Sequence, residues 1–231
     1  TTPLAERIRP QTISDFFGQQ HLLGSGKPIR LMIENDTPSS FILWGPPGTG
    51  KTTIARIIAN QTQAEFFQIN AVSSGVKDIR AVIDIGTRNK ELGKRTILFI
   101  DEIHRFNKAQ QDALLHSIES GVLILIGATT ENPSFEVIPA LRSRARVFVL
   151  EELSKQDLVD ILKSAIGKDE YLKQLNIKSV DENYLIYLSG GDARIMLTIL
   201  EAAVIQEISK DEIILTKEIF ENIVQRKNIL Y

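Results

Sequence analysis

Short apolar runs alternate with amphipathic stretches through the first two thirds of the chain. Five runs are rich in β-branched and aromatic residues and too short for helices: Phe41–Trp44, Phe66–Ile69, Thr96–Ile100, Val122–Ile126 and Val147–Leu150. Their nearly continuous hydrophobicity is typical of strands that are covered on both faces of a parallel sheet. Helical spacing of apolar residues marks the segments between them: Thr52–Gln63, Val76–Leu92, Lys108–Ser120 and a short one near Val137–Arg142. This alternation predicts βαβ units, and hence an α/β fold in which helices flank a parallel five-stranded sheet.

The pattern changes after Leu150, where no further strand is expected. Ser154-Lys155-Gln156-Asp157 fits a capping box, and it opens an amphipathic helical run. Further helices are predicted over three ranges: Glu182–Leu188, Asp192–Ile208 and Thr216–Gln225. We therefore expect an α/β domain over residues 1–152, in which residues 1–40 form a loop-rich arm, and a small all-α domain over residues 153–231.

Composition excludes several classes of protein. The 231 residues include 27 Lys and Arg, 29 Asp and Glu, and 43% hydrophobic residues, which suits a folded chain with a sizeable core. The absence of cysteine excludes a disulfide framework, a thiolate nucleophile and a Cys-ligated metal centre. The three histidines are scattered without metal-ligand spacing, so surface or packing roles are expected for them.

Neither a membrane segment nor a targeting leader is recognisable. No apolar run approaches the ~18 residues that a membrane helix needs, so we expect a cytoplasmic location and no membrane partner. A net charge of −2 disfavours nucleic-acid binding through the overall charge of the protein. It is compatible with a local basic face that binds nucleic acid. The chain starts without Met and stops after a basic stretch, so we expect it to be part of a longer protein.

A phosphate-binding motif follows the first predicted strand. The segment Gly45–Thr52 fits G-x-x-x-x-G-K-[ST] and opens a predicted helix, which is the context that this motif requires. Its glycines let backbone N–H groups turn toward phosphates at a helix N-terminus. Lys51 is expected to contact the β- and γ-phosphates, and the Thr52 hydroxyl to hold Mg²⁺. Nucleotide contacts are predicted for Gly45, Pro46, Pro47, Gly48, Thr49, Gly50, Lys51, Thr52 and Thr53.

Polar residues end two other predicted strands. Thr96–Ile100 runs into Asp101 and Glu102, and a strand end of this kind lies in the crevice where open α/β sheets bind ligands. Asp101 is expected to hold the water shell of Mg²⁺, and Glu102 to act as the general base for an attacking water. Thr130 ends a neighbouring strand, where it would reach the γ-phosphate or the water; the simpler alternative is that threonine favours strands.

These motifs, in this order, resemble the AAA+ ATPases of the clamp-loader clade. Two further motifs contribute: Ser143-Arg144-Ala145 and Gly191-Asp192-Ala193-Arg194. The run Gly127–Glu136, with Ile103–Lys108, narrows the resemblance to the family of replication-associated recombination protein A and the Werner-helicase-interacting protein. The resemblance covers the whole chain. It implies a P-loop AAA+ fold, ATP with Mg²⁺ as cofactors, and a lid formed by the second domain.

The resemblance also implies roles for residues outside the phosphate loop. Thr130 resembles sensor 1, with Asn132 as a weaker candidate. Arg144 resembles the arginine finger that reaches the γ-phosphate of a neighbouring subunit, and Arg142 or Arg146 would take that role in another register. The resemblance further implies a C-terminal helical domain that builds the tetramer and is absent from this sequence, so we expect the chain alone to be mainly monomeric. Because the finger acts in trans, we also expect the chain alone to be a poor ATPase.

Three other groups of residues have implied roles. Arg194, followed by Ile195, resembles sensor 2 at a helix start that Asp192 is expected to cap. Asn70 resembles the regulatory residue that holds Glu102 inactive until DNA binds. A segment of the arm resembles the one that packs around adenine: Ile8, Arg9, Pro10, Phe17, Gly18 and Gln19.

The implied function is that of a Mg²⁺-dependent, DNA-stimulated ATP hydrolase acting in replication-fork maintenance, recombination and repair. Expected partners are single-stranded DNA ends and forks, further copies through a C-terminal part, and single-strand-binding and other replication proteins; in a bacterium it would associate with the nucleoid. DNA contacts are predicted for Lys77 and Arg80, with Arg105 and Lys108 behind them. The alternatives are an ATP-gated DNA- and partner-binding module, a clamp-loader subunit, for which Gly127–Glu136 is the wrong signature, and a branch-migration motor, disfavoured because no winged-helix module follows.

Overall fold

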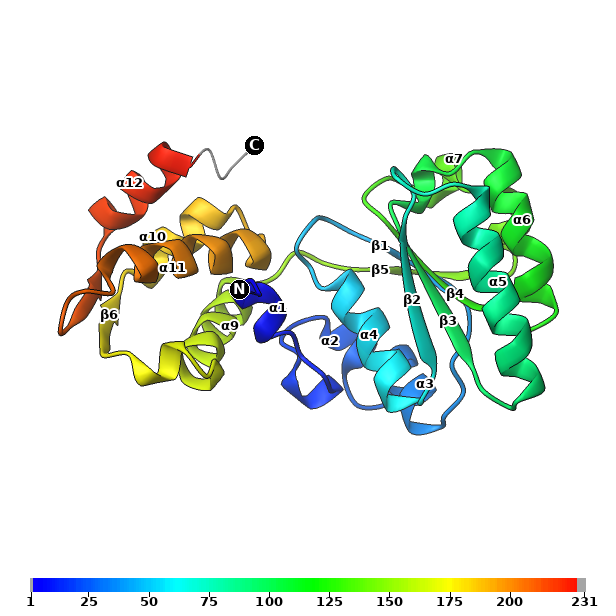
Figure 1. The fold of residues 1–231 in the computed structure, drawn as a ribbon, viewed down its shortest axis with the longest axis horizontal. Coiled ribbons are helices and arrows are strands. Elements are labelled where there is room, and N and C mark those ends of the chain that lie inside the picture. Colours follow the sequence, from blue (N-terminus) through cyan, green and yellow to red (C-terminus); the bar gives the residue numbers. More distant parts are fainter. Residues whose placement is uncertain (1, 228–231) are drawn as a thin grey trace. The chain divides into compact units, whose positions relative to one another are not determined.

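The computed structural model describes residues 2–227, and its first unit, Pro10–Glu151, is built on a five-stranded sheet (Figure 1). The strand order is β2-β3-β4-β1-β5, and every neighbouring pair is parallel. The strands are β1 Phe41–Trp44, β2 Glu65–Asn70, β3 Thr96–Asp101, β4 Ile124–Thr129 and β5 Arg146–Val149. The parallel α/β fold predicted from the alternation of strands and helices is confirmed.

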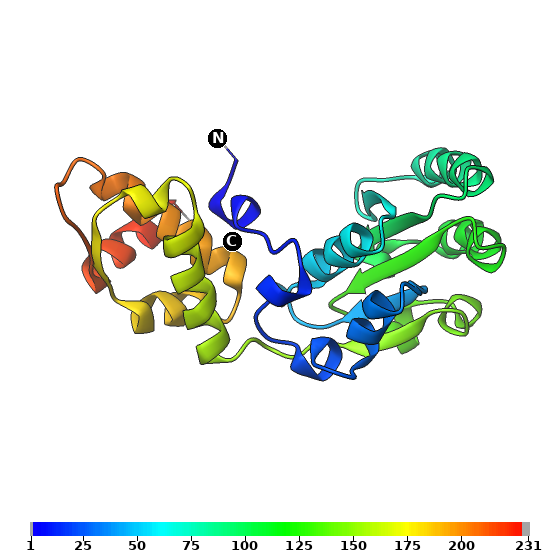
Figure 2. The ribbon, with the colours of Figure 1, turned by 90° about the horizontal axis from the view of Figure 1, so that it is seen from below.

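Helices cover both faces of this sheet (Figure 1, Figure 2). One face packs against α3 (Pro28–Glu34) and α4 (Lys51–Gln61), and the other against α5 (Val76–Glu91) and α6 (Lys108–Glu119). The alternation of side chains along β1 divides its residues, because Phe41 and Leu43 join the first core and Ile42 the second. Short elements complete the unit: η1 Ile13–Asp15, α2 Gln20–Leu23, η2 Ile103–Arg105, α7 Pro133–Glu136 and α8 Pro139–Arg142.

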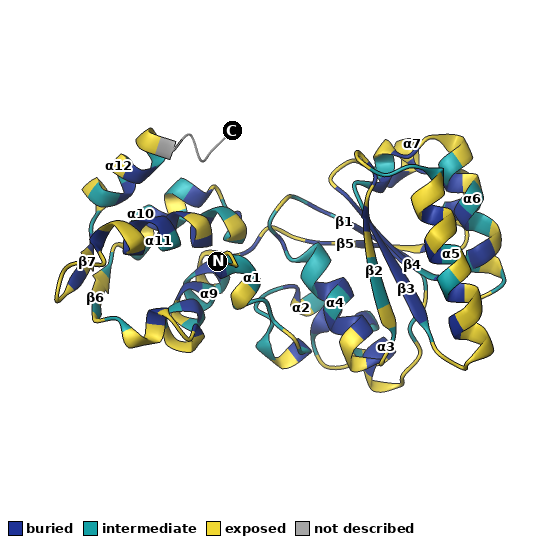
Figure 3. Ribbon diagram, viewed as in Figure 1, coloured by how far each residue is buried: buried dark blue, intermediate teal, exposed yellow. Residues whose placement is uncertain are grey.

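Burial follows the position of each strand in the sheet (Figure 3). The inner strands β1, β3 and β4 are buried almost throughout, whereas the edge strand β2 exposes three of its six residues and the edge strand β5 three of its four. The ends of several strands differ from the prediction by one to three residues, and the fourth strand, predicted to begin at Val122, begins later. Val122 and Leu123 both donate their N–H groups to the Ser117 carbonyl at the end of α6, so the strand begins at Ile124.

The second unit combines residues 152–227 with the described residues up to Arg9. Its helices are α1 Leu4–Arg7, α9 Lys155–Lys168, η3 Leu172–Gln174, α10 Glu182–Ser189, α11 Ala193–Glu207 and α12 Lys217–Lys227. The prediction of an all-α domain is wrong, because β6 (Ile177–Val180) and β7 (Ile213–Leu215) pair as a parallel ribbon. Only three residues of β7 alternate between buried and exposed, which is too short a pattern to indicate a strand.

The N-terminal segment packs within this second unit, whereas the predicted boundary placed it with the sheet. Leu4 is fully buried in the helical core. Arg7 donates from Nε to Asp169 Oδ2 at 2.8 Å and from Nη1 to Glu201 Oε1 at 2.7 Å. Asp169 is itself buried and also accepts the Leu172 N–H at 3.0 Å. These long-range contacts bring the start of the chain to α9 and α11.

No helix within residues 2–227 is long and apolar enough to cross a bilayer.

The substitution Arg7→Met tests this attachment. It leaves the buried Asp169 carboxylate without its cation, and we expect it to lower the free energy of unfolding by about 3 kcal/mol. The hydrogen bond from Arg7 is the main reason that the pKa of Asp169 lies below its ordinary value of 3.8. A lowered carboxyl pKa stabilises the fold above the unfolded value, so the difference between wild type and variant should be full at pH 7 and shrink below pH 4.

Urea unfolding measures the size of this effect, and hydrogen exchange locates it in α9 and α11. Lys178→Met is the matched control, because Lys178 pairs with Glu212 in an exposed ion pair worth less than about 1 kcal/mol. Equal effects of Arg7→Met and Lys178→Met, or a loss of protection confined to the sheet, would contradict the assignment.

Candidate nucleotide site

The phosphate loop leaves the sheet where β1 is held on both sides. The Gly45 N–H donates to the Thr129 carbonyl at 3.1 Å, and the Leu150 N–H donates to the Trp44 carbonyl at 2.7 Å. A Cβ at Gly45 would lie 2.9 Å from the Leu150 side chain, so a residue larger than glycine does not fit there. The loop therefore starts from a fixed point at the carboxyl edge of the sheet.

The loop reaches α4 through Gly50, which has a φ of 104°. This left-handed conformation favours glycine, and a Cβ would also collide with the ring of Phe16. The Thr49 hydroxyl donates to the Pro46 carbonyl at 2.8 Å and closes the loop on itself. The predicted motif thus has the geometry of a strand, a compact glycine turn and a helix N-terminus, which suits an anion.

Lys51 lies across this loop. Its Nζ donates to the carbonyls of Gly45 and Pro46, both at 2.7 Å. Those carbonyls keep the ammonium beside the position where phosphates would sit at a helix N-terminus. Binding of a nucleotide would exchange these bonds for bonds to phosphate oxygens, which carry a full negative charge.

The two predicted acidic residues lie where β3 ends. Asp101 Oδ1 accepts the Glu102 N–H at 3.0 Å, which leaves its other oxygen without a hydrogen bond in residues 2–227. Glu102 has a φ of 54°, a left-handed conformation that is unfavourable for a residue with a Cβ and that turns the chain into η2. Its carboxylate has no hydrogen-bond or ion-pair partner in the described part of the chain. The acidic pair is thus held by its backbone, with carboxylate oxygens available.

The donor atoms present fit magnesium. The Thr52 hydroxyl has no partner among the described residues, and hydroxyl and carboxylate oxygens are the ligands that Mg²⁺ accepts. No group of three or more His, Cys, Asp or Glu in residues 2–227 could hold a metal by itself. A magnesium ion at Thr52 and Asp101 would therefore need phosphate oxygens and water to complete its coordination, as it does in nucleotide sites.

The end of β4 carries a polar contact that the sequence did not reveal. Thr129 is 1% exposed, and its Oγ1 lies 2.9 Å from His104 Nδ1 and 3.0 Å from the Glu131 nitrogen. Thr130, the predicted sensor, follows it and is exposed. Asn132, the weaker candidate, caps α7 by accepting the Ser134 N–H at 3.0 Å. The role of Thr130 remains a prediction, and His104 is an unexpected polar partner of the strand end.

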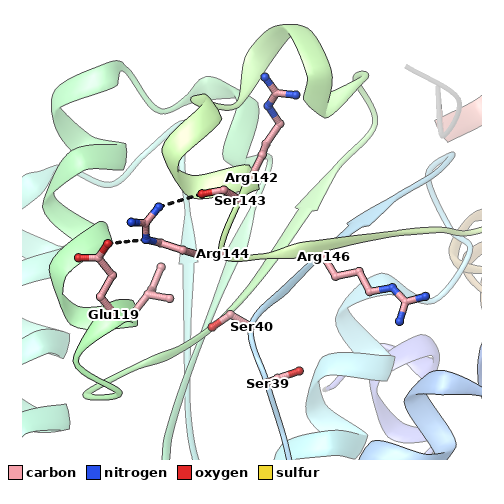
Figure 4. A pocket seen from close by; sticks show the side chains of 8 residues that line it. Ser39, Ser40, Glu119, Arg142, Ser143, Arg144 and Arg146 are labelled. Carbon is pink, nitrogen blue, oxygen red and sulfur yellow. Dashed lines mark hydrogen bonds and ion pairs between the residues drawn. The ribbon is translucent and has the colours of Figure 1, made fainter.

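Three arginines lie close together in the sequence, at positions 142, 144 and 146. Arg144 is the one of the three with two guanidinium nitrogens bonded to other residues (Figure 4). Its Nη1 donates to the Ala140 carbonyl at 2.9 Å and to Ser143 Oγ at 2.8 Å, and its Nε pairs with Glu119 on α6. Nη2 is left without a partner in the described part of the chain. Arg144, Ser143 and Glu119 line a pocket whose other lining residues are Ser39, Ser40, Ile118, Arg142 and Arg146.

The two alternative arginines point away from Arg144 (Figure 4). Arg142 Nε donates to the Val137 carbonyl at 3.0 Å, and Arg146 lies over the Phe148 ring with 5.0 Å to its centroid. Their guanidinium groups are engaged along the edge of their own chain. The choice of Arg144 as the finger stays a prediction.

Arg194 lies in the second unit, in the first turn of α11. Asp192 caps this helix, as expected, because its Oδ1 accepts the N–H groups of Arg194 at 2.8 Å and Ile195 at 3.3 Å. The Arg194 side chain is 66% exposed, and its single charged contact is with Asp192 Oδ2 at 3.3 Å. A cation at a helix N-terminus is disfavoured by the helix dipole, so a bound anion would be a better partner for it.

The predicted adenine segment is divided between the two units. Ile8 and Arg9 belong to the second unit, and Pro10, Phe17 and Gly18 to the first. Gln19, also predicted to contact adenine, is buried in the first unit. Its amide donates to the carbonyls of Thr49 at 3.3 Å and Glu151 at 2.8 Å, and accepts the Glu151 N–H at 3.0 Å. Gln19 therefore fixes the phosphate loop to the end of the unit, and its contact with adenine stays a prediction.

The regulatory and DNA-contacting candidates lie around the start of α5. Asn70 is opposite Asp101 in the β2–β3 register, but its Oδ1 accepts the Val72 N–H at 2.8 Å, and no hydrogen bond joins it to Glu102 in residues 2–227. Lys77 and Arg80 are exposed on the first turns of α5, without an ion pair to any described residue. They are available to an external anion.

Comparison with protein families identifies an AAA domain. Residues 41–153 match the model of the ATPase family associated with various cellular activities. The chain is 48% identical to replication-associated recombination protein A of Haemophilus influenzae, over 87% of this chain and 46% of that protein. It is 49% identical to the Escherichia coli K12 protein of the same name, over 86% and 45%, and 41% identical to ATPase WRNIP1 of Dictyostelium discoideum, over 99% and 28%.

The chain thus spans about half the length of the bacterial relatives, 45% and 46% in these two. Among solved structures it is similar to the Thermotoga maritima RuvB Holliday junction branch migration motor. That similarity has a TM-score of 0.76 and 26% sequence identity, over 96% of this chain and 74% of the other. Fold and sequence comparisons therefore agree on the class of domain.

Lys51→Ala tests the phosphate site directly. A ligand at 100 times its dissociation constant stabilises the folded state by about 2.7 kcal/mol, or about 5–10 °C in melting temperature for a chain of this size. We expect ATP with Mg²⁺ to produce this shift in the wild type and in Lys94→Ala, an exposed control, and to produce none in Lys51→Ala. The quantity compared is the change in melting temperature on adding ligand to each variant. The melting temperatures themselves are not compared, because Lys51 also makes hydrogen bonds within its own loop. An equal shift in Lys51→Ala would place the nucleotide elsewhere.

Proposed function

Because the chain belongs to the AAA+ ATPase family of replication-associated recombination protein A and WRNIP1, we propose that it hydrolyses ATP with Mg²⁺ and uses the energy to remodel DNA ends or forks as an oligomer. The observation that carries this proposal is the placement of the phosphate loop and the Asp101–Glu102 pair. They follow β1 and β3, which are parallel strands separated only by β4. Parallel strands end at the same edge of the sheet, so the two motifs serve one crevice.

Each residue of the crevice has a distinct chemical task. Lys51 exchanges its carbonyl partners for the β- and γ-phosphates. Glu102, whose carboxylate has no partner within residues 2–227, orients and polarises the attacking water. Bound at Thr52 and Asp101, Mg²⁺ would neutralise charge that develops on the phosphates. Thr130 contacts the γ-phosphate or the water, and Arg194, with Ile195, contacts the nucleotide from the second unit, which serves as the lid.

Arg144 acts on the nucleotide of a neighbouring copy. Its Nε and Nη1 are held by its own chain, so Nη2 is presented from a fixed side chain. An arginine supplied in this way is worth about 10³–10⁵ in rate. A single chain would therefore hydrolyse ATP slowly, and assembly through parts of the protein outside this sequence would raise the rate.

DNA is the proposed partner that stimulates hydrolysis. The relatives are named for replication-associated recombination, which supports single-stranded ends and forks as substrates and replication proteins, such as single-strand-binding protein, as partners. Lys77 and Arg80 contact phosphates. Asn70 relays DNA binding to Glu102, which is the residue after its register partner Asp101. A cytoplasmic, nucleoid-associated location follows from the same role.

Glu102→Gln separates binding from hydrolysis. The amide keeps the size of the side chain and cannot accept the proton of the water, so turnover should fall about 10²–10⁴-fold while ATP–Mg²⁺ still raises the melting temperature. Steady-state phosphate release measures turnover, and Glu91→Gln, at the far end of α5, is the exposed control.

Unchanged turnover in Glu102→Gln would contradict the role of this carboxylate. If turnover falls and the variant still replaces the wild type in cells, hydrolysis is dispensable and the ATP-gated binding module becomes the better description.

A further inference from the structure

We propose that Phe135 on α7 is a stacking platform for an unpaired base of single-stranded DNA, whose phosphates contact Arg105 and Lys108. The inference rests on DNA as the partner in the proposed function, and it names the part of the DNA that this surface recognises. We refer to Phe135, Arg105 and Lys108 together as the α7 surface.

The exposure of Phe135 is the first observation. Its side chain is 84% exposed, the largest fraction among the exposed large hydrophobic residues of the described chain. An aromatic ring exposed to water contributes no burial energy to the stability of the fold. Exposed rings of this kind are common on binding surfaces. Phe135 lies in the family-characteristic run Gly127–Glu136, whose remaining residues include the strand end of the nucleotide site.

The backbone that carries the ring is fixed. Pro133 and Val137, on either side, are buried. Gln111, only 2% exposed, donates to the Glu136 carbonyl at 3.2 Å and accepts the Ile138 N–H at 2.8 Å. With both flanks anchored, α7 cannot turn Phe135 into the core without breaking these contacts. The backbone position of Phe135 is therefore fixed, which suits stacking because no backbone segment has to be ordered on binding.

Two cations lie on segments next to α7, because η2 packs against this helix. The same Gln111 amide donates to the Phe106 carbonyl at 3.0 Å, so it joins α7 to the segment between η2 and α6. Arg105 ends η2 and Lys108 begins α6. Both are exposed, and neither has an ion pair or a side-chain hydrogen bond within residues 2–227. Both cations are therefore available to an external anion.

The charges favour a base at the ring and phosphates at the cations. Glu131 and Glu136 are exposed on the same loop as Phe135, and they would repel a phosphate placed on the ring. A base has no charge and stacks on aromatic rings, while neighbouring Lys and Arg track the backbone. In a duplex the base faces are already stacked and not available. The α7 surface is therefore suited to single-stranded DNA.

The surface is also connected to the catalytic carboxylate. Glu102 is the residue directly before η2, and its carbonyl accepts the Arg105 N–H at 2.8 Å. A DNA strand bound at Arg105 is thus one short helical turn from Glu102. This connection offers a direct route by which single-stranded DNA would stimulate hydrolysis.

Binding of a labelled poly-dT oligonucleotide, measured by fluorescence anisotropy with ATP and Mg²⁺ over a series of salt concentrations, tests the proposal. Phe135→Ala should weaken binding about tenfold and leave the salt dependence unchanged, because no phosphate contact is lost. Phe135→Trp should restore the affinity. The double variant Arg105→Ala, Lys108→Ala should weaken binding and also reduce the slope with salt. Leu92→Ala is the matched control, since Leu92 is 70% exposed beyond the far end of α5.

A second measurement reports stacking itself. In a Trp44→Phe background, the tryptophan of Phe135→Trp is the only one in the chain, and its fluorescence should be quenched by poly-dT and not by a blunt duplex. Equal affinities of Phe135→Ala and wild type for poly-dT would overturn the proposal, as would a Phe135→Ala effect on self-association without an effect on DNA. If the wild type binds ATP–Mg²⁺ but no DNA, the proposed DNA partner fails, and the α7 surface with it.

Discussion

The site depends on how the last residues of β1 are held between two neighbouring strands. Thr129 of β4 accepts the Gly45 N–H, and Trp44 accepts the N–H of Leu150 just beyond β5. These two bonds fix the point at which the phosphate loop leaves the sheet. Because every strand is parallel, the same edge also receives Asp101, Glu102 and Thr130. The order β3-β4-β1 then sets the spacing between loop and acidic pair.

Two buried glutamine side chains connect the loops around this edge of the sheet to the rest of the first unit. Gln19 joins the phosphate loop at Thr49 to Glu151, and Gln111 joins the segment after η2 to α7 and Ile138. Each amide uses both its donor and its acceptor, and a buried amide satisfied in this way is costly to displace. The phosphate loop that leads to Lys51 and the helix α7 that carries Phe135 are consequently both fixed to the scaffold of the first unit.

The parts of the molecule with local signatures were predictable from sequence, and those built from distant side chains were not. Alternating apolar runs predicted the five strands, and the motif Gly45–Thr52 predicted the strand, turn and helix at the phosphate loop. The contact between Thr129 and His104 spans 25 residues and leaves no periodic trace. The same holds for Arg7 and Asp169, which are 162 residues apart and place the start of the chain in the helical unit. In β7 the three alternating residues are simply too few to predict a strand.

We propose that Arg144 of one copy completes the nucleotide site of another. The most direct test mixes a trace of wild-type chain with a large excess of Glu102→Gln chain, and measures phosphate release per wild-type site as the excess rises. The inactive excess chain still carries Arg144, so turnover per wild-type site should increase, and an equal excess of the double variant Glu102→Gln, Arg144→Ala should give no increase. If the two excess chains have the same effect, or turnover is fast and independent of concentration, Arg144 does not act between copies.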